Sequence, residues 1–409
     1  MDKSKTLFLT HSFNESTIDS VNNIAKVMMD NNVYCLDYME LYYKYGYRGF
    51  QNFLLNYIDK NKINTIIFAY YSADFYFDLS FLEKLRKNVF LVRISGDTEH
   101  FFEVKDQYDA QTMDLTLVNS PFAQAKLKQM GFNSIVYFEW FNGDRLKKYE
   151  NIQKNIDVSF VGLITGREKR SNYINFLLDN GIKVQYFGYG SPHGIVSIEE
   201  KAKIFNNSKI NLNFSDVAEQ TILTRNHKIS RHLKGIKGNN FEIALCGGFI
   251  LSEYAFGIEN FFKIDNEITV FHGKADLLEK IKYYLAHEKE REQIALNCYE
   301  KAVKYFNATL TIPKLLSTID EFRMKKTYCS TEIYLDEEFI RNHTTFRVLL
   351  ILKFLKTGKL KFALEELNII IKYRKLDWYQ ISEFLKEEFL DSFPKIKSVL
   401  KFLFKKKKA

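Results

Sequence analysis

The sequence predicts an α/β protein with two doubly wound domains followed by a helical extension. Short β-branched or aromatic runs alternate with amphipathic segments through most of the chain, which is the pattern of a parallel sheet covered by helices. The alternation pauses once, in a polar stretch rich in Lys and Asn at 142–156, and then restarts. After residue 325 the sequence predicts helices and no strand.

The first half of the chain should contain six strands, separated by amphipathic segments such as 16–30, 40–60 and 80–87. They are TLFLT (6–10), VYCLDY (33–38), TIIFAYY (65–71), VFLVRIS (89–95), LTLVNS (115–120) and SIVYFEW (134–140). We therefore assign residues 1–145 to a first Rossmann-like domain.

A second Rossmann-like domain is expected at 146–325, with its last part, 275–324, mostly helical. Its strands are DVSFVG (157–162), KVQYFGYG (183–190), KINLNF (209–214), GGFILSEY (247–254) and ITVFHG (268–273). Residues 326–409 form the helical extension, in which 348–358 and 359–373 predict a hairpin that turns at Gly358.

Composition narrows the class of protein. The formal charge of +9 and the pI near 9.0 favour a polyanionic partner, which could be nucleic acid, anionic lipid or a phosphorylated small molecule. The four cysteines form no C-x-x-C pair, so we expect neither a disulfide framework nor a zinc site, and a cytoplasmic location. No apolar run approaches the roughly 20 residues of a membrane span.

The loops after the strands of the second half are rich in glycine and in cations. Ligands of parallel sheets bind beyond the carboxyl ends of the strands, where glycine allows close approach and cations can meet a diphosphate. Such residues are Gly162, Gly166, Arg167, Lys169, Arg170, Gly188, Gly190 and Gly194, followed by Arg225, Lys228, Arg231, Lys234 and Lys237 before the helix with Glu242. The alternatives are ordinary turns, solvated cations and a first-turn acid favoured by the helix dipole.

The run from Asp157 to Phe306 resembles the catalytic half of group 1 glycosyltransferases of the GT-B fold, in the branch of the spore protein CgeB. The matching stretches are DVSFVG, NNSKINLNFS, KGNNFEIALCGGFILSEY, GIENFF and IKYYLAHEKEREQIALNCYEKAVKYF. RISGDTEHFFEVKDQYDAQTMDLTLVNS also resembles the first domain of that branch. The resemblance implies an acceptor-side first domain and a second domain that binds a nucleotide-sugar.

The resemblance also implies roles for single residues. Glu242 would bind the ribose hydroxyls, Lys237 with Arg167 or Arg170 the diphosphate, and the backbone near Gly188 the base. Cys246, Gly247 and Gly248 would end the helix of Glu242 and turn the chain into the next strand. The full set of expected donor-binding residues is Glu242, Lys237, Arg231, Arg167, Arg170, Gly162, Gly188, Gly247 and Gly248.

Two positions depart from the family pattern. Lys234 stands where many relatives carry an acid that holds the donor sugar, and Asn239 stands where this branch often has arginine. We expect retention of the anomeric configuration. Because no Asp-x-Asp lies near a strand end, we expect no metal or other cofactor, and arginine and lysine would neutralise the diphosphate instead.

The candidate catalytic residues follow the strand VFLVRI of the first half. Asp97, Glu99 or His100 could bind or deprotonate an acceptor hydroxyl at the cleft between the domains. Asp97 would serve equally well as a helix N-cap. Thr10 and His11, at the end of the first strand, are further candidates of the same kind.

The hypothesis is a cytoplasmic glycosyltransferase that moves a sugar from a nucleotide donor to a glycan, lipid-linked or protein acceptor in polysaccharide biosynthesis. The tail FPKIKSVLKFLFKKKKA has apolar residues at helical spacing with lysines between them, so it could bind an anionic membrane surface or pack on the body. The alternatives in function are a non-catalytic scaffold and a nucleic-acid-binding protein. Nucleic acid is disfavoured because the aromatic residues lie in periodic core segments and no binding motif is present.

Overall fold

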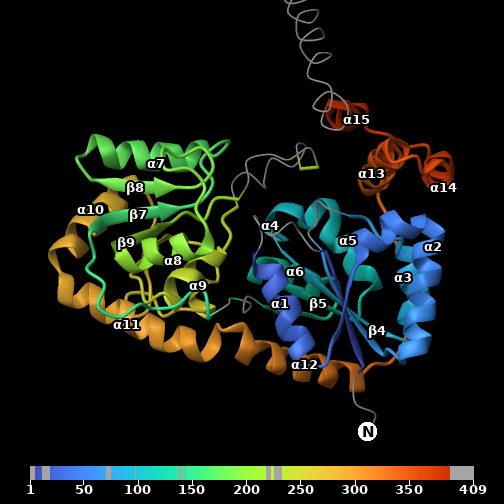
Figure 1. Cartoon of the computed structure of the whole chain (residues 1–409), viewed down its shortest axis with the longest axis horizontal. Helices are drawn as coiled ribbons and strands as arrows, with labels where there is room; N and C mark the ends of the chain where they lie inside the picture. Colours follow the sequence, from blue (N-terminus) through green and yellow to red (C-terminus); the bar gives the residue numbers. More distant parts are fainter. Residues whose placement is uncertain are drawn as a thin grey trace, which may run out of the picture.

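The computed structural model describes residues 5–11, 19–70, 75–96, 98–137, 141, 143–217, 223–224 and 233–386. Among these residues the strands form two parallel sheets, one of six strands in the order β2-β1-β3-β4-β5-β6 and one of five in the order β11-β10-β9-β7-β8. The predicted fold class, two doubly wound domains with a helical extension, is confirmed (Figure 1).

The first domain contains every strand that the sequence predicts for it. The strands are β1 (Thr6–Thr10), β2 (Tyr34–Asp37), β3 (Thr65–Ala69), β4 (Phe90–Ser95), β5 (Leu115–Val118) and β6 (Ser134–Val136). Its helices are α1 (Asp19–Asp30), α2 (Tyr38–Asn61), α3 (Leu79–Arg86), α4 (Thr98–Phe101), the π-helix η1 (Phe102–Asp106), α5 (Gln107–Asp109), the 3₁₀ turn η2 (Ala110–Thr112) and α6 (Pro121–Gln129).

The second domain also has its predicted strands, which are β7 (Ile156–Val161), β8 (Val184–Phe187), β9 (Ser208–Asn213), β10 (Ile250–Glu253) and β11 (Thr269–Phe271). Its helices are α7 (Glu168–Asp179), α8 (Ile198–Asn207), α9 (Gly238–Leu245), the 3₁₀ turn η4 (Ile258–Asn260), α10 (Lys274–Ala286) and α11 (Glu288–Tyr305). One apolar core joins the sheet to α8 and α9, and another joins it to α7, α10 and α11, so both faces of the sheet are covered.

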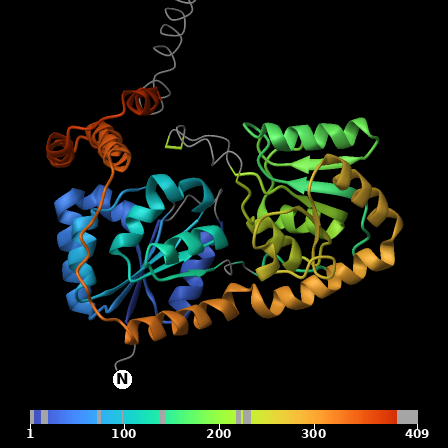
Figure 2. The ribbon, with the colours of Figure 1, turned by 180° about the vertical axis from the view of Figure 1, so that it is seen from behind.

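Helix α12 (Ala308–Met324) returns the chain to the first domain. Ile312, Leu315 and Ile319 lie in one core with Phe8 and Met28. Figures 1 and 2 show α11 and α12 running in sequence beneath both domains. The expected second domain, 146–325, therefore ends in a helix that packs on the first domain, because its apolar face covers the sheet there.

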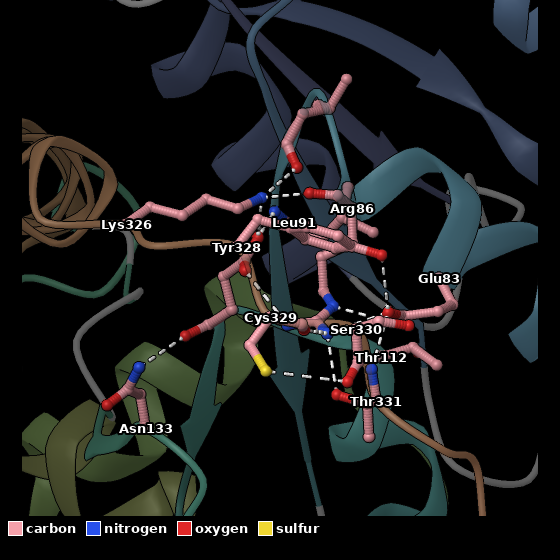
Figure 3. A network of polar contacts seen from close by, with 12 residues as sticks. Glu83, Arg86, Leu91, Thr112, Asn133, Lys326, Tyr328, Cys329, Ser330 and Thr331 are labelled. Carbon is pink, nitrogen blue, oxygen red and sulfur yellow. Dashed lines mark hydrogen bonds and ion pairs between the residues drawn. The ribbon is translucent and has the colours of Figure 1, made fainter.

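A network of polar contacts fixes the chain just after α12 to the first domain (Figure 3). Lys326 donates to the Val89 carbonyl and to Asp114 at 2.8 Å each, and Arg86 donates to the Cys329 carbonyl at 2.8 Å. Burial lowers the pKa of Lys326 even though Asp114 favours its charged form. The extension therefore begins from a fixed point on the first domain.

The extension consists of α13 (Glu337–Lys356), α14 (Leu360–Tyr373) and α15 (Trp378–Leu385). The predicted hairpin is present as α13 and α14, and Gly358 between them has a φ of +72°. Within the extension, Arg347 of α13 and Glu366 of α14 form a buried ion pair, with Nη1 3.3 Å from Oε2. Both side chains also bond to the Tyr42 hydroxyl of the first domain, which lies 3.0 Å from Arg347 Nη1. The tail from 387 onward lies outside the described residues.

We expect Arg347→Met to destabilise the protein strongly. The substitution leaves Glu366 buried without its cation, and breaking a buried ion pair in this way costs about 3–5 kcal/mol. Adding Glu366→Gln should restore part of that loss because the uncompensated charge is then gone. Denaturant unfolding curves measure both effects.

The matched control is Lys375→Met, because Lys375 forms an exposed ion pair with Glu337 at 2.9 Å. Its unfolding midpoint should equal that of the parent. An Arg347→Met variant with the parent midpoint would show that the buried pair does not hold the extension.

Candidate active site

The second sheet reverses its strand order between β7 and β9. Strand β7 pairs with β8 on one side and with β9 on the other. A crevice beyond the carboxyl ends of two such strands is where doubly wound sheets bind ligands. The loops that follow β7 and β9 meet there, and the N-terminus of α9 joins them because Asn239 donates to the Val161 carbonyl at 2.7 Å.

Asp216, after β9, forms ion pairs with two arginines at the start of α7, the N-cap Arg167 and Arg170 in its first turn. Arg170 Nε lies 2.7 Å from Asp216 Oδ1, and Arg167 Nη1 lies 3.6 Å from Oδ2. Arg170 is buried and also donates to the Leu163 carbonyl at 3.0 Å. Arg170 therefore fixes the loop, whereas Arg167, with 18% of its side chain exposed, lies nearer to solvent. Asp216 was missed by sequence reasoning, although its place at the end of NLNFSD was a signal.

Two glycines let these loops touch through their backbones. Gly188 has a φ of +119°, and a Cβ placed on it would lie 2.2 Å from the carbonyl oxygen of Gly162. The amide of Gly162 donates to the Phe187 carbonyl at 2.9 Å. Gly162 and Gly188 therefore lie in contact beside the carboxyl ends of β7 and β8, and their place in the donor site stays a prediction.

Helix α9 carries the predicted ribose-binding acid. Glu242, with 17% of its side chain exposed, forms an ion pair with Lys201 of α8. Lys201 also donates to Asn239 Oδ1 at 2.9 Å. Lys237 is the N-cap residue of α9, is half-buried, and has no ion pair among the described residues. Sequence reasoning missed Lys201. The only signal in the sequence was its position in the first turns of α8, directly after the capping box.

The far end of α9 has the termination that the sequence predicts. Gly247 has a φ of +68°, and its amide donates to the Ala244 carbonyl at 3.0 Å. The Gly248 amide donates to the Ile243 carbonyl at 3.0 Å, which completes a Schellman motif. Both glycines lie at the opposite end of α9 from Lys237, at the amino edge of the sheet. Their predicted role in ending the helix is present in the structure, and a role in donor binding stays a prediction.

Lys234, the departure from the family pattern, has an acid beside it. Its Nζ lies 2.9 Å from Glu253 Oε1, at the carboxyl end of β10. The Glu253 side chain is 7% exposed and accepts a hydrogen bond from the Ser215 amide at 3.1 Å. Burial, and then the charge of Glu253, raises the pKa of Tyr173 to about 12. Lys234 thus compensates a buried carboxylate, which was not apparent from the sequence.

The segment between β9 and α9 reaches the first domain. Thr224 Oγ1 lies 3.2 Å from His100 Nε2, and Leu223 packs on Phe101 and Val104. Glu99 faces Gly235, where a Cβ would lie 3.0 Å from its Oε2. Glu99 and His100 of the predicted segment therefore lie at the domain interface, with His100 itself buried. Asp97 and Arg231 lie outside the described residues.

The first sheet has its own reversal point, between β1 and β3. His11 follows β1 there, with its Nδ1 3.8 Å from Asp37 Oδ1 and its ring 5.8 Å from that of Tyr38. Thr10 is buried at the end of the strand. His11 thus lies at the crevice of the first sheet and His100 at the contact with the second domain.

Comparison with known proteins agrees with this architecture. Residues 169–317 match the model of a family described as glycosyl transferase-like. That match lies within the second domain and the start of α12, and the two doubly wound sheets have the architecture of the GT-B fold. A comparison with curated protein sequences finds no match, and the CgeB-like branch stays a prediction.

Among solved structures, the chain is similar to a sucrose-phosphate synthase from Thermosynechococcus elongatus, with 10% identity and a TM-score of 0.56 over 78% of this chain and all of that one. It is similar to HepE of Anabaena in complex with UDP-glucose, with 12% identity and a TM-score of 0.53 over 78% of this chain and all of that one. The chain is also similar to a glycosyltransferase from Rickettsia africae, with 11% identity and a TM-score of 0.50 over 80% of this chain and all of that one. At these identities the likeness concerns the fold.

We expect Gly188→Ala to destabilise the second domain by at least about 2 kcal/mol, because a disfavoured φ and a backbone clash add together. Gly166→Ala is the matched control. Gly166 also has a positive φ, of +71°, but a Cβ there would meet nothing within 4 Å. Gly166→Ala should lower the free energy of unfolding by only about 1 kcal/mol. Equal melting temperatures for the two variants would contradict the close contact between Gly162 and Gly188.

Proposed function

We propose that this protein transfers a sugar from a nucleoside-diphosphate donor to a hydroxyl acceptor in the synthesis of cell-surface glycans or glycoconjugates. One observation carries the proposal. The loops after β7 and β9 and the N-terminus of α9 meet at the reversal point of the second sheet, and Arg167, Lys237 and Glu242 belong to these elements. A helix N-terminus beside cations suits a diphosphate. HepE, which shares the fold, was solved with UDP and with UDP-glucose.

The donor would bind through three kinds of contact. Lys237 and the positive end of α9 would attract the diphosphate. Glu242 would accept hydrogen bonds from the ribose hydroxyls, and Lys201 would then move from the carboxylate towards a phosphate. Because cations surround the diphosphate, the leaving group is stabilised without a metal ion. We propose retention of configuration, which the anomeric signal of the product would test.

The acceptor would enter from the first domain. Asp97, Glu99 and His100 remain the candidates to bind or deprotonate its hydroxyl, with His11, at the reversal point of the first sheet, as the alternative. A glycan, a lipid-linked sugar or a protein hydroxyl would suit these groups. A non-catalytic scaffold would also bind a donor, so turnover of a radiolabelled nucleotide-sugar distinguishes an enzyme from a scaffold. Binding of oligonucleotides in place of nucleoside diphosphates would favour the nucleic-acid alternative.

We predict that Glu242→Gln lowers UDP affinity tenfold to a hundredfold while the fold is kept. Hydrogen bonds to a charged group contribute about 1.5–3 kcal/mol, which corresponds to that change in affinity. Lys237→Ala should weaken binding similarly through the diphosphate. Calorimetric titration with UDP, GDP and TDP measures the affinities, and melting curves check the fold.

The control for these variants is Lys203→Ala, because Lys203 is an exposed cation on α8. It should bind nucleotide as the parent does. Parent-like affinity in both Glu242→Gln and Lys237→Ala would remove the proposed donor site.

We further propose a peripheral location on the inner face of the cell membrane, supported by the basic tail. Each lysine near an anionic surface contributes about 1 kcal/mol, and Lys405–Lys408 close the chain after an apolar repeat. Deletion of 394–409 should weaken co-sedimentation with anionic liposomes. Unchanged co-sedimentation would show that the tail is not an anchor.

A further inference from the structure

Helix α14 has an apolar stripe on its solvent side. The four residues recur at a spacing of four, three and four, which keeps them on one face of the helix. Their exposed fractions are 61% for Leu360, 51% for Leu364, 41% for Leu367 and 52% for Ile371. The opposite side of α14 is already buried, because Ala363 and Glu366 pack towards the first domain and α13. A continuous exposed stripe of this kind is unusual on a monomeric surface and indicates a partner.

Cations border the stripe on α14, and two exposed aromatic residues follow it in the sequence. Lys361 and Lys372 are exposed along one edge of it. At the start of α15, Trp378 and Tyr379 are 74% and 57% exposed. Large rings with a polar edge are favoured at the boundary between lipid headgroups and acyl chains, and lysines are favoured beside anionic headgroups. The combination therefore matches the chemistry of an anionic bilayer.

We infer that α14 and the start of α15 form a membrane-binding face for anionic lipid. The stripe Leu360, Leu364, Leu367 and Ile371 would enter the interface, with the lysines at the headgroups and Trp378 at their boundary. A second copy of the chain is a poorer partner. Antiparallel packing of two stripes would bring Lys361 of one copy towards Lys372 of the other, and like charges oppose such contact. None of the described helices combines the length and apolar character that a bilayer crossing requires.

The extension lies close to the carboxyl ends of the strands of the first domain. Phe339 of α13 packs on Tyr76 and Tyr108, which follow β3 and β4. The extension thus lies on the side of the first domain to which the strand carboxyl ends point (Figures 1 and 2). If the proposed function holds, a bilayer at this face would bring a lipid-linked acceptor towards the first domain. The membrane-binding face itself does not depend on that activity.

The test uses the fluorescence of Trp378. The chain has two tryptophans, Trp140 and Trp378, so a Trp140→Phe background leaves Trp378 as the only reporter. With vesicles of phosphatidylcholine and phosphatidylglycerol, its emission should shift to shorter wavelength. Pure phosphatidylcholine should give no shift, and the partition coefficient should fall as salt is raised.

The stripe is tested in the same background with Leu364→Gln and Leu367→Gln combined. Replacing two exposed leucines removes apolar area that would enter the membrane interface, so the partition coefficient should fall about tenfold or more. The matched control combines Leu178→Gln and Leu296→Gln, which are 43% and 39% exposed on the second domain. Its partition coefficient should equal that of the background, and far-UV circular dichroism checks the fold of both variants.

Three results would overturn the inference. The first is the absence of vesicle binding by the full chain. The second is equal vesicle binding by the stripe variant and the control. The third is a concentration-dependent dimer that the stripe variant abolishes, which would assign the stripe to a second copy. Because none of these measurements uses nucleotide or turnover, a failed UDP titration would sink the proposed function and leave the membrane-binding face standing.

Discussion

The pairing of the two chain crossings between the domains is the constraint on which the rest of the structure depends. The chain passes into the second domain at Phe141 and returns at Asn307 and Ala308, and these segments form a β-bridge in which the Ala308 amide donates to the Phe141 carbonyl at 2.9 Å. The two crossings therefore lie side by side, and we call these paired segments the hinge. Helix α12 can then cover the first sheet, and Thr224 and Gly235 of the second domain can reach His100 and Glu99 of the first.

The hinge extends into the helix of the candidate donor site. The Phe241 ring stacks on Phe141 at 5.2 Å with an interplanar angle of 8°, and meets Phe306 edge-on at 4.8 Å. Phe241 directly precedes Glu242, so α9 touches the hinge with one face and carries the acid on another. A ligand that draws Lys237 or Glu242 towards itself therefore acts on a helix that is packed against the joint between the domains.

The sequence predicts the strands well because a buried parallel strand is a local pattern of β-branched and aromatic residues, and each such run became a strand. The end of α9 was predictable for the same reason, because its signal, Gly247 and Gly248, directly follows the helix in the sequence. The ion pairs were not predictable in this way. Asp216 with Arg170, and Lys201 with Glu242, join residues that are far apart in sequence, and only the strand order brings them together. The return of α12 to the first domain depends equally on a distant apolar surface.

The distribution of charge explains why a net charge of +9 alone could not identify the partner. Arg93, Arg170 and Arg347 are buried and compensate the acids Asp106, Asp216 and Glu366, so these cations stabilise the fold and attract nothing outside it. The exposed cations are a different population. Among the cations that are not fully buried, Lys237 and Arg167 lie where we propose that a diphosphate binds, and Lys361 and Lys372 border the apolar stripe of the extension. The two proposed ligands, a diphosphate and an anionic lipid surface, would thus each meet a separate set of accessible cations, because burial decides which cations remain accessible.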